Sequence, residues 1–556
     1  MTNQIEAVLF DMGGTLRSTV KNSEAEKEEM IQRMLDLLGA RIPVDEFSML
    51  LSGRAAAYKL WAEETLVELN ESDLWTKWML PDWPVEQISA LAMKLNQLYR
   101  AKTGTRIVFP ETRDVVLELF RRGYRLGLVS NTTSSIEVPA ALQELHISGC
   151  FETVVLSAVV GKRKPDPAIL LEATQRMGIA PEKCAYIGDL VGRDVAAARR
   201  AGFSKAVILR DQRQPNSEKL YTSSLVPDAV ITNLTDLLEI FPPRFAPQPA
   251  AIYDASLSTM WALKNFPTLA DFFEAARRIG FARIELNHKV TTPMLDGIDM
   301  SQYQFSSVHE PCPADIGEDE LKKRDWLISS IDESCRIDGV RAIKRSIDIA
   351  KCIGASTIII HAGHSTPDEN MLEKKLRQLL DAGQHDSDEY KSIQAQMLKL
   401  RAEFAVGSFE SVKKSMLELL AYAEPLGIRL GLENRYHYLE HPSPDELGIL
   451  LTLAGPEQVG FIYDLGHAET LSRLGFYPEN EWLDRFATRI IGTHLHDVIG
   501  TTDHYAAGLG DANFNTAAAF LPENAFRTCE FQTFNNPEAV TAGLKFLVEH
   551  GCIKKL

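Results

Sequence analysis

Residues 10–16 of the chain are FDMGGTL, directly after the apolar run Ala7-Val8-Leu9. An aspartate therefore leaves the end of a short apolar strand and enters a turn with two glycines and a threonine. Such a turn presents a carboxylate at the edge of a parallel sheet, where the carboxyl ends of the strands meet. Two residues after Asp11 stands Gly13, which has no side chain to act as a general acid. The stretch predicts a parallel α/β sheet with a carboxylate site, and it leaves the chemistry of that site open.

The first 240 residues continue this alternation of short apolar runs with segments of helical periodicity. Strands are expected at 6–10, 125–129, 153–156, 184–187, 206–209 and 229–231. Between the first two strands, about 20–105 is amphipathic, carries tryptophans at 61, 75, 78 and 83, and has little strand character. A helical cap inserted into the sheet explains it. The sequence predicts a doubly wound parallel sheet with a helical cap over residues 1–241.

A different domain is expected in the second half. The segment PPRFAPQP at 242–249 breaks all periodicity, because repeated prolines deny hydrogen bonds to helix and sheet alike, and we place a linker over 242–250. Over 251–556 eight apolar strands alternate with helical segments: AIYDASL, RIELN, FSSVH, STIIIHAG, RLGLENR, VGFIYD, IIGTHLHD and FRTCEF. Eight strand–helix units in about 300 residues are the size of a (β/α)₈ TIM barrel. A charged helical stretch at 367–405 is interpreted as an arm or lid after the fourth strand.

The composition limits the class of protein. A chain of 556 residues is too long for one core, and 45% apolar with 24% charged residues describes a soluble globular protein. The formal net charge of −17 disfavours a broad surface for nucleic acid or anionic membrane. Seven scattered cysteines, none spaced C-x-x-C, suit reduced thiols in a cytoplasmic protein. No signal peptide is visible at the N-terminus, and no uncharged apolar stretch has the length of a membrane span.

Polar residues follow several strands of the first half: Asp11, Ser130-Asn131, Lys164 and Asp189. In a doubly wound sheet, the strand ends that carry them converge on one crevice. Two carboxylates, a lysine, a hydroxyl and free backbone N–H groups suit Mg²⁺ together with a phosphoryl group. Any one of these residues alone is explained as well by a cap or a turn. In this order, and all together, they indicate a site.

The segments FDMGGTL, VSNTT (129–133), GKRKPDP (161–167) and GDLVGRD (188–194) occur in this order. Over about residues 4–240 the chain thereby resembles the haloacid dehalogenase superfamily. The resemblance implies that Asp11 is a nucleophile that takes up a phosphoryl group, and that it binds Mg²⁺ together with Asp189 and Asp194. It further implies that Ser130, Asn131 and Lys164 bind the phosphate, and that the cap selects the substrate.

Gly13 is a departure from the phosphatases of that superfamily, which carry a general acid at this position. General acid–base help is typically worth about 10²–10⁴ in rate, so its loss is serious without being total. Branches that cleave carbon–halogen or carbon–phosphorus bonds also lack this acid. Three interpretations remain open: a slow or substrate-assisted phosphatase, another displacement chemistry, or a binding or regulatory domain. We favour phosphatase-like chemistry.

The second half concentrates imidazoles and carboxylates at the carboxyl ends of its predicted strands, the face where barrels build active sites. They are His309, His361, Glu433, Asp464, His467, His494, His496, His504 and Glu530. Such a set without thiolates suits Mn²⁺, Co²⁺, Mg²⁺ or Zn²⁺. Glu433, Asp464, His494 and Glu530 stand out, because four strands would each aim one ligand at a common point. Glu285 is interpreted as a salt-bridge partner at the barrel rim.

Four segments, GLEN (431–434), YDLGHA (463–468), HLHD (494–497) and D-H-x₃-G-x-G from 503, resemble the xylose-isomerase-like TIM barrels. That superfamily holds sugar and sugar-phosphate isomerases and epimerases as well as endonuclease-IV-type enzymes, and the resemblance spans about 251–550. It implies that Glu433, Asp464, His494 and Glu530 bind a metal, with Glu433 and Glu530 as the proton-transfer pair. By the same resemblance, His467 contacts the substrate. The resemblance also implies that three further histidines either line the pocket or hold a second metal: His309, His361 and His504.

We therefore predict a bifunctional cytoplasmic enzyme, a Mg²⁺-dependent hydrolase fused to a metal-dependent isomerase or epimerase of sugars or sugar phosphates. One alternative is a barrel enzyme whose first half only binds or regulates. Another is a metal-dependent phosphodiesterase of the endonuclease-IV type. Two features oppose this second alternative: Thr502 stands where those nucleases carry an aspartate ligand, although Asp503 is a candidate substitute, and an acidic chain lacks cations for duplex phosphates. The expected partner is a small sugar or sugar phosphate, without membrane or nucleic acid.

Overall fold

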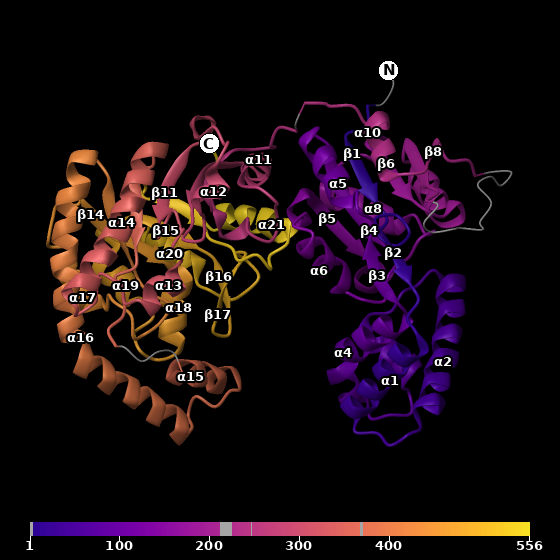
Figure 1. Cartoon of the computed structure of the whole chain (residues 1–556), viewed down its shortest axis with the longest axis horizontal. Helices are drawn as coiled ribbons and strands as arrows, with labels where there is room; N and C mark the ends of the chain where they lie inside the picture. Colours follow the sequence, from indigo (N-terminus) through magenta and orange to yellow (C-terminus); the bar gives the residue numbers. More distant parts are fainter. Residues whose placement is uncertain (1–3, 212–224, 246, 367–370) are drawn as a thin grey trace. The chain divides into compact units, whose positions relative to one another are not determined.

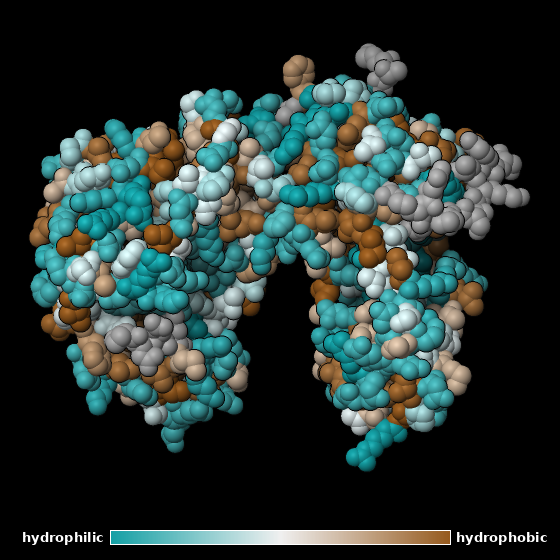
Figure 2. All heavy atoms as spheres, viewed as in Figure 1, coloured by the Kyte–Doolittle hydropathy of each residue, from teal (hydrophilic) through white to brown (hydrophobic). Residues whose placement is uncertain are grey.

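The computed structural model describes residues 4–211, 225–245, 247–366 and 371–556. The chain divides into two compact units, Met1–Pro247 and Gln248–Leu556 (Figure 1). Hydrophilic and hydrophobic residues are intermixed on the face of each unit that Figure 2 shows. Among the described residues, none of the helices combines the length and the apolar character needed to cross a lipid bilayer.

The first unit is built on a six-stranded parallel sheet with the order β5-β4-β1-β6-β7-β8. Its strands are β1 (Ala7–Phe10), β4 (Arg125–Ser130), β5 (Phe151–Leu156), β6 (Cys184–Gly188), β7 (Lys205–Leu209) and β8 (Ala229–Ile231). Helices α8 (Ala168–Met177) and α9 (Ala196–Ala201) contact each other and the sheet. The strands are nearly continuous apolar runs, as expected where both faces of a sheet are covered. The predicted doubly wound sheet is confirmed.

A helical cap is inserted between β1 and β4, as predicted. It contains α1 (Glu24–Leu38), α2 (Val44–Thr65), α3 (Glu71–Leu74), the π-helix η1 (Trp75–Met79) and α4 (Val85–Thr103), seen together in Figure 1. Ser23 and Glu26 form a capping box that starts α1, and Phe47, Trp75 and Leu95 lie in the buried core of the cap. The antiparallel ribbon of β2 (Arg17–Val20) and β3 (Thr105–Val108) joins the cap to the sheet. This ribbon was not predicted.

The second unit is a closed barrel of eight parallel strands, which confirms the predicted (β/α)₈ fold. Around the barrel run β9 (Tyr253–Ser258), β10 (Phe281–Leu286), β11 (Phe305–His309), β12 (Thr357–Ile360), β13 (Arg429–Glu433), β14 (Val459–Asp464), β15 (Ile490–Leu495) and β18 (Phe526–Cys529). Strand glycines make room for large neighbours inside: a Cβ on Gly492 would lie 2.2 Å from the ring of Phe526. The barrel is thus a packed core, and its functional side chains gather at the strand ends.

Helices and one hairpin complete the second unit. The outer helices are α11 (Leu269–Ile279), α14 (Glu333–Ile353), α16 (Asp388–Ala423), α17 (Pro444–Leu450), α18 (Leu465–Arg473), α19 (Glu481–Phe486), α20 (Phe514–Phe520) and α21 (Pro537–Glu549). Two short helices, α12 (Thr292–Leu295) and α13 (Glu318–Lys323), lie in βα loops. The hairpin of β16 (Asp497–Ile499) and β17 (Thr502–Tyr505) follows β15.

The stretch predicted as an arm at 367–405 consists of α15 (Met371–Asp381) and the first half of α16; its residues 367–370 lie outside the described ones. Leu376 and Leu379 of α15 share a buried cluster with Tyr390 and Met397 of α16. The structure differs from the prediction in one respect, because α16 continues without a break to Ala423. The arm is therefore an extension of the barrel's own fourth helix (Figure 1).

Candidate functional site

The turn after β1 positions Asp11 at the point where the strand order reverses. The Asp11 amide donates to the carbonyl of Ile187 on β6 at 2.8 Å. Gly14 has a φ of +83°, and a Cβ there would lie 2.2 Å from Oδ2 of Asp189, so only glycine fits. Gly13 is different: its φ is not in the left-handed region, and a Cβ there would meet no described heavy atom within 4 Å. The turn thus has open space where an acid is missing.

Three carboxylates meet beside this turn. Asp11, Asp189 and Asp194 each offer an oxygen, and these oxygens lie within 4.8 Å of one another. Asp194 belongs to the π-helix η4 (Val191–Val195), and its Oδ2 accepts from the amides of Asp189 at 3.1 Å and Leu190 at 3.0 Å. Oxygen donors of this kind fit Mg²⁺. The structure therefore brings together the three residues predicted as metal ligands.

Lys164 lies at the centre of the group and is completely buried. Its Nζ is 2.8 Å from Oδ1 of Asp11, 2.9 Å from Oδ1 of Asp194 and 2.6 Å from the hydroxyl of Tyr186. Asn131 binds the backbone of Lys164 with both amide atoms, at 2.9 Å and 2.8 Å. Ser130 is buried at the end of β4. Two of the predicted phosphate-binding residues, Asn131 and Lys164, thus hold each other and the nucleophile candidate.

Sequence reasoning missed Arg193, which extends from η4 into the carboxylate group. Its Nη2 is 2.7 Å from Oδ2 of Asp11, 2.7 Å from Oδ1 of Asp189 and 3.0 Å from Oδ2 of Asp194. Burial lowers the pKa of Arg193, but the three carboxylates outweigh burial and raise this pKa well above its ordinary value. For Asp189, burial dominates and raises the pKa to about 7. The signal was present in the sequence, since Arg193 directly precedes Asp194 in GDLVGRD.

A cavity of about 260 Å³ lies where the cap meets the loop after β4. Lys59, Arg100 and Arg163 supply cationic groups to its wall, next to Asn131 and Thr133. Each of these cations has a carboxylate neighbour: Arg163 lies 3.5 Å from Glu68 on the wall, Lys59 lies 3.8 Å from Glu63, and Arg100 contacts Glu137.

Three arginines surround a single carboxylate beside this cavity. Arg17 and Arg100 contact Glu137, and Arg106 lies 3.4 Å from it. Burial raises the pKa of Glu137, yet the arginines, Arg100 first, lower it to about 2. A cavity with this excess of positive charge suits an anionic ligand.

The barrel gathers its predicted metal ligands at one point. Glu433, Asp464 and His494 end β13, β14 and β15, Glu530 follows β18, and their ligand atoms lie within 4.8 Å of one another. Nδ1 of His494 is 2.6 Å from Glu433, 3.0 Å from Glu530 and 3.5 Å from Asp464. Three carboxylates with one imidazole fit a divalent cation such as Mn²⁺, Co²⁺, Mg²⁺ or Zn²⁺.

The charges of this group stabilise one another. Burial raises the pKa of Glu433 and of Glu530, but His494 outweighs burial, so both pKa values lie well below their ordinary range. The pKa of His494 lies well above its ordinary range, because Glu530 and Glu285 outweigh the effect of burial. The two glutamates are therefore held as carboxylates, the form that can bind a cation.

Glu285 lies inside the barrel, so its interpretation as a residue of the rim is wrong, although it is the salt-bridge partner of His494. It is fully buried, and its Oε2 accepts from the hydroxyls of Ser307 at 2.7 Å and Thr528 at 3.2 Å. The same oxygen is 3.2 Å from Nε2 of His494. Metal-binding histidines commonly donate their other ring N–H to a carboxylate, which fixes the tautomer and the ring. Glu285 is placed to do this for His494.

A second group of possible ligands shares Glu433. Nε2 of His361 is 3.0 Å from Oε2 of Glu433, and Nε2 of His309 is 3.7 Å from the same oxygen. The possible ligand atoms of His309, His361 and Glu433 all lie within 4.8 Å of one another, close enough to hold one metal ion. Both histidines were predicted to line the pocket or to hold a second metal, and the structure places them beside the four-ligand group.

A third group lies on the other side of Asp464. His467, His496 and His504 offer nitrogens within 4.8 Å of each other and of Asp464. The sequence analysis placed His496 among the strand-end candidates without a specific role, and the structure brings its Nε2 to 3.0 Å from Asp464.

The β16–β17 hairpin adds a carboxylate to this third group. Asp503 lies 3.5 Å from His467 and 2.9 Å from His504, whereas the neighbouring Thr502 is exposed. The structure therefore points Asp503, not Thr502, toward the histidines.

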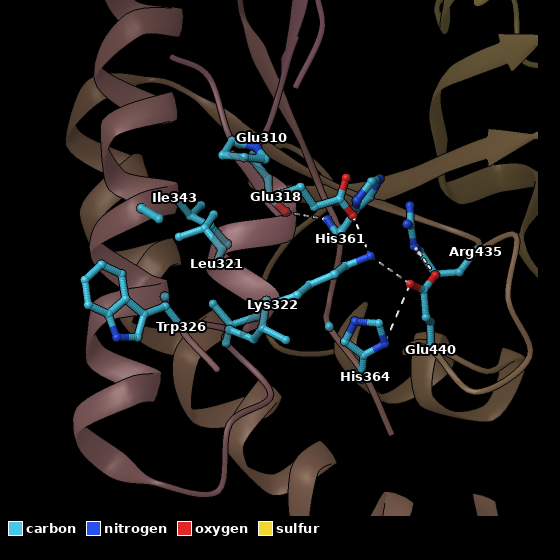
Figure 3. A pocket seen from close by; sticks show the side chains of 16 residues that line it. Glu310, Glu318, Leu321, Lys322, Trp326, Ile343, His361, His364, Arg435 and Glu440 are labelled. Atoms are coloured by element: carbon cyan, nitrogen blue, oxygen red, sulfur yellow. Dashed lines mark hydrogen bonds and ion pairs between the residues drawn. The ribbon is translucent and has the colours of Figure 1, made fainter. Parts of the chain in front are cut away.

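Figure 3 shows a small cavity beside His361, lined by charged residues such as Lys322 and Glu440 and by apolar residues such as Leu321 and Trp326. Lys322 lies 2.7 Å from Glu318 and 3.7 Å from Glu440. Arg435 is 3.0 Å from Glu440 and 2.7 Å from Glu433. The cavity is thus connected to the metal ligands through Arg435 and His361. Sequence reasoning had not singled out Lys322 or Arg435.

Known proteins resemble each half of the chain. A family model described as haloacid dehalogenase-like hydrolase matches residues 5–202, and one described as xylose isomerase-like TIM barrel matches residues 273–550. Glyceraldehyde 3-phosphate phosphatase of Methanopyrus kandleri is 28% identical over 243 residues, which cover 42% of this chain and 97% of that protein. Phosphoglycolate phosphatase of Nitrosococcus oceani is 31% identical over 227 residues, 39% of this chain and 93% of that protein. A solved D-tagatose 3-epimerase-like structure is 19% identical, with a TM-score of 0.38, over 53% of this chain and 96% of that one.

Proposed function

Because the chain belongs to the haloacid dehalogenase-like hydrolases through residues 5–202 and to the xylose isomerase-like TIM barrels through residues 273–550, we propose that it is a bifunctional enzyme with one active site in each unit. The first unit hydrolyses a phosphate monoester. The second isomerises or epimerises a sugar or sugar phosphate. Phosphorylated sugars are a substrate class that both sites could share.

The observation that carries the barrel proposal is the position of Glu433 and Glu530. They approach the same point from β13 and β18, between which β14 and β15 lie in the barrel order. A divalent cation bound there supplies a Lewis acid next to the substrate oxygens. One glutamate can then remove a proton from a substrate carbon while the other returns a proton to the opposite face or to the neighbouring carbon.

The barrel proposal is tested by proton exchange. We expect the chain to incorporate deuterium from D₂O into a ketose or ketose phosphate, with Mn²⁺ present, as followed by NMR. Glu433→Gln or Glu530→Gln should lose both exchange and turnover, because each variant lacks a proton acceptor and a ligand charge. Glu549→Gln, on the exposed side of α21, is the matched control. A Glu530→Gln enzyme with full sugar activity would contradict the proposal.

The contact of Asp11 with Lys164, beside Asp189 and Asp194, supports the hydrolase proposal. A carboxylate oxygen of Asp11 attacks phosphorus as the ester P–O bond breaks, and water later cleaves the aspartyl phosphate. Since Gly13 offers no acid, the leaving oxygen takes its proton from the substrate or from water. A bound Mg²⁺ ion supplies charge that stabilises the phosphoryl oxygens.

We expect slow Mg²⁺-dependent hydrolysis of p-nitrophenyl phosphate. Asp11→Asn should abolish it, because an amide does not attack phosphorus, whereas Asp36→Asn on the exposed face of α1 should not. An Asp11→Asn variant indistinguishable from the wild type would instead favour a binding or regulatory first unit.

A second candidate function for the barrel is metal-dependent phosphodiester cleavage. The observation that favours phosphodiester cleavage is that two further groups of possible ligands lie next to the four-ligand group. One contains His309 and His361, and the other contains His467 and His504. Elemental analysis separates the two functions. About one bound metal per barrel supports the isomerase, whereas three metals together with nicking of abasic duplex support the phosphodiesterase.

A further inference from the structure

We propose that Arg193 is an internal counter-ion of the first site and competes with a divalent cation for the carboxylates of Asp11, Asp189 and Asp194. The inference rests on the proposed function only in taking Mg²⁺ as that cation. It assigns a role to a residue of the GDLVGRD segment that sequence reasoning passed over.

The guanidinium of Arg193 lies between the three carboxylates. One nitrogen, Nη2, lies within 3.0 Å of oxygens from three different carboxylates. A Mg²⁺ ion needs carboxylate oxygens at about 2.0–2.1 Å, so it would have to occupy the same small space between these oxygens. The guanidinium and the ion therefore exclude each other.

The remaining oxygens of the three carboxylates are already engaged. Lys164 contacts Oδ1 of Asp11 and Oδ1 of Asp194. The backbone of Gly14 packs on Oδ2 of Asp189, so closely that a Cβ there would lie 2.2 Å from this oxygen. The oxygens of Asp11 and Asp189 that are left to an entering cation are therefore those that Arg193 contacts, whereas Oδ2 of Asp194 also accepts from two backbone amides.

The charge balance points the same way. When all three carboxylates are ionised, Lys164 and Arg193 leave one negative charge uncompensated. A divalent cation that replaces Arg193 cancels it, whereas a divalent cation added beside Arg193 leaves a net positive charge among buried groups, which is costly. The Arg193 side chain is 25% exposed, so it has a route toward solvent.

The test is calorimetric titration of the full chain with MgCl₂, without substrate. Arg193→Ala should bind Mg²⁺ at the first site roughly 5- to 150-fold more tightly than the wild type, the usual range of coupling between two ligands. Adding Asp189→Asn to Arg193→Ala should remove the gain, which assigns it to this site, because the barrel is identical in all variants. Arg176→Ala, an exposed arginine on α8, is the matched control and should change nothing.

An Arg193→Ala chain that melts like the wild type but binds Mg²⁺ no more tightly would overturn the proposal. If Arg193→Ala fails to fold, Arg193→Lys takes its place, since a shorter ammonium group reaches the three oxygens less well and should give a smaller gain in affinity. Unchanged affinity in a folded Arg193→Lys chain would likewise overturn it. Because binding is measured without turnover, the result does not depend on whether the unit hydrolyses phosphate esters.

Discussion

Gly13 and Gly14 are neighbours in one turn, yet they tolerate a side chain very differently. At Gly13 a Cβ meets no described atom within 4 Å, so Gly13→Asp should fold and restore an acid beside Asp11. We expect hydrolysis of p-nitrophenyl phosphate with Mg²⁺ to rise, by up to about 10²-fold. Gly14→Ala is the counterpart: its Cβ would lie 2.2 Å from Asp189, and it should lower the melting temperature instead. A folded Gly13→Asp chain without any rate gain would contradict the hydrolase assignment.

Glu285 should act on the barrel metal through His494. Its Oε2 is 3.2 Å from Nε2 of His494, and its Oε1 is buried without a hydrogen-bond partner among the described residues. We expect Glu285→Gln to weaken Mn²⁺ binding by roughly 10- to 100-fold, the usual cost of losing a partner of a ligating histidine. The measurement is a Mn²⁺ titration with Glu549→Gln as control. Unchanged Mn²⁺ affinity would show that Glu285 only fills the barrel interior.

The residues of the two sites differ in how far they could be predicted. Asp11 and Asp464 were found because each directly follows an apolar run, which places a side chain at the edge of a parallel sheet. Glu285 lies within a strand, and only the barrel packing decides that it faces His494. Asp503 was named as a candidate ligand, but neither for it nor for Arg193 does a local pattern specify where the side chain points, because they lie on a hairpin and on a π-helix. Sequence reasoning thus misses those residues whose direction only the tertiary packing decides.

At the scale of elements, the cluster around Glu137 connects the ribbon of β2 and β3 and the cap helix α4 to helix α6 (Glu137–Glu144). Arg17 lies on β2, Arg100 on α4 and Arg106 on β3, while Glu137 begins α6. The arginines lower the pKa of Glu137 to about 2, so its stabilising effect is complete above about pH 4.5 and is lost as the pH falls toward 2. The free energy of unfolding should fall by up to about 3 kcal/mol over this range.

This pH dependence is measured by urea unfolding at several pH values. Glu137→Gln should reduce it, whereas Glu144→Gln, an exposed position on the same helix, should leave it as in the wild type. If the free energy of unfolding depends on pH equally in the wild type and in Glu137→Gln, the cluster contributes nothing to stability.

The arm helix α15 fixes the loop after β13. Glu373 accepts from the amide of Tyr438 at 2.8 Å, and Arg377 donates to the carbonyls of Tyr436 at 2.8 Å and Thr501 at 3.1 Å. We expect Arg377→Ala to lower the free energy of unfolding by roughly 1–3 kcal/mol, because Glu373 loses its arginine partner and keeps only His437 and the Tyr438 amide. Urea unfolding measures the loss, with the exposed Lys374→Ala on the same helix as control. A loss as small as that of the control would mean that the arm does not hold this loop.

Elements with a strong apolar period could be predicted, and weak ones could not. Strands such as AVLF of the first unit and TIII of the barrel are apolar runs that are buried along their whole length. The ribbon strands RSTV and TRIV are partly exposed, so they carry little apolar signal. The end of the arm at residue 405 was misplaced for another reason. Helix α16 keeps its helical period from Asp388 to Ala423, and nothing in the sequence marks where it leaves the arm for the barrel.

For the whole chain, the two compact units predict two independent sites. Asp11→Asn should remove phosphatase turnover and leave sugar turnover unchanged, and Glu433→Gln should do the reverse. Both activities are measured on the same preparations. A variant of one unit that also abolished the activity of the other would contradict this independence.

Metal removal should act on the stability of the second unit. Glu433, Asp464 and Glu530 are buried together. Arg435, His494 and His504 contact this group, and a divalent cation would add positive charge at the point where the ligand oxygens meet. A ligand at 100 times its Kd stabilises a fold by about 2.7 kcal/mol, so we expect EDTA to lower the melting temperature and Mn²⁺ to restore it. In the double variant Glu433→Gln/Glu530→Gln, the difference in melting temperature between the EDTA-treated and the Mn²⁺-loaded chain should shrink. Only one of the three carboxylate charges then remains to be balanced by a cation. Equal melting of the EDTA-treated and Mn²⁺-loaded wild-type chain would show that the neighbouring histidines and Arg435 are sufficient to hold the group and that it is no metal site.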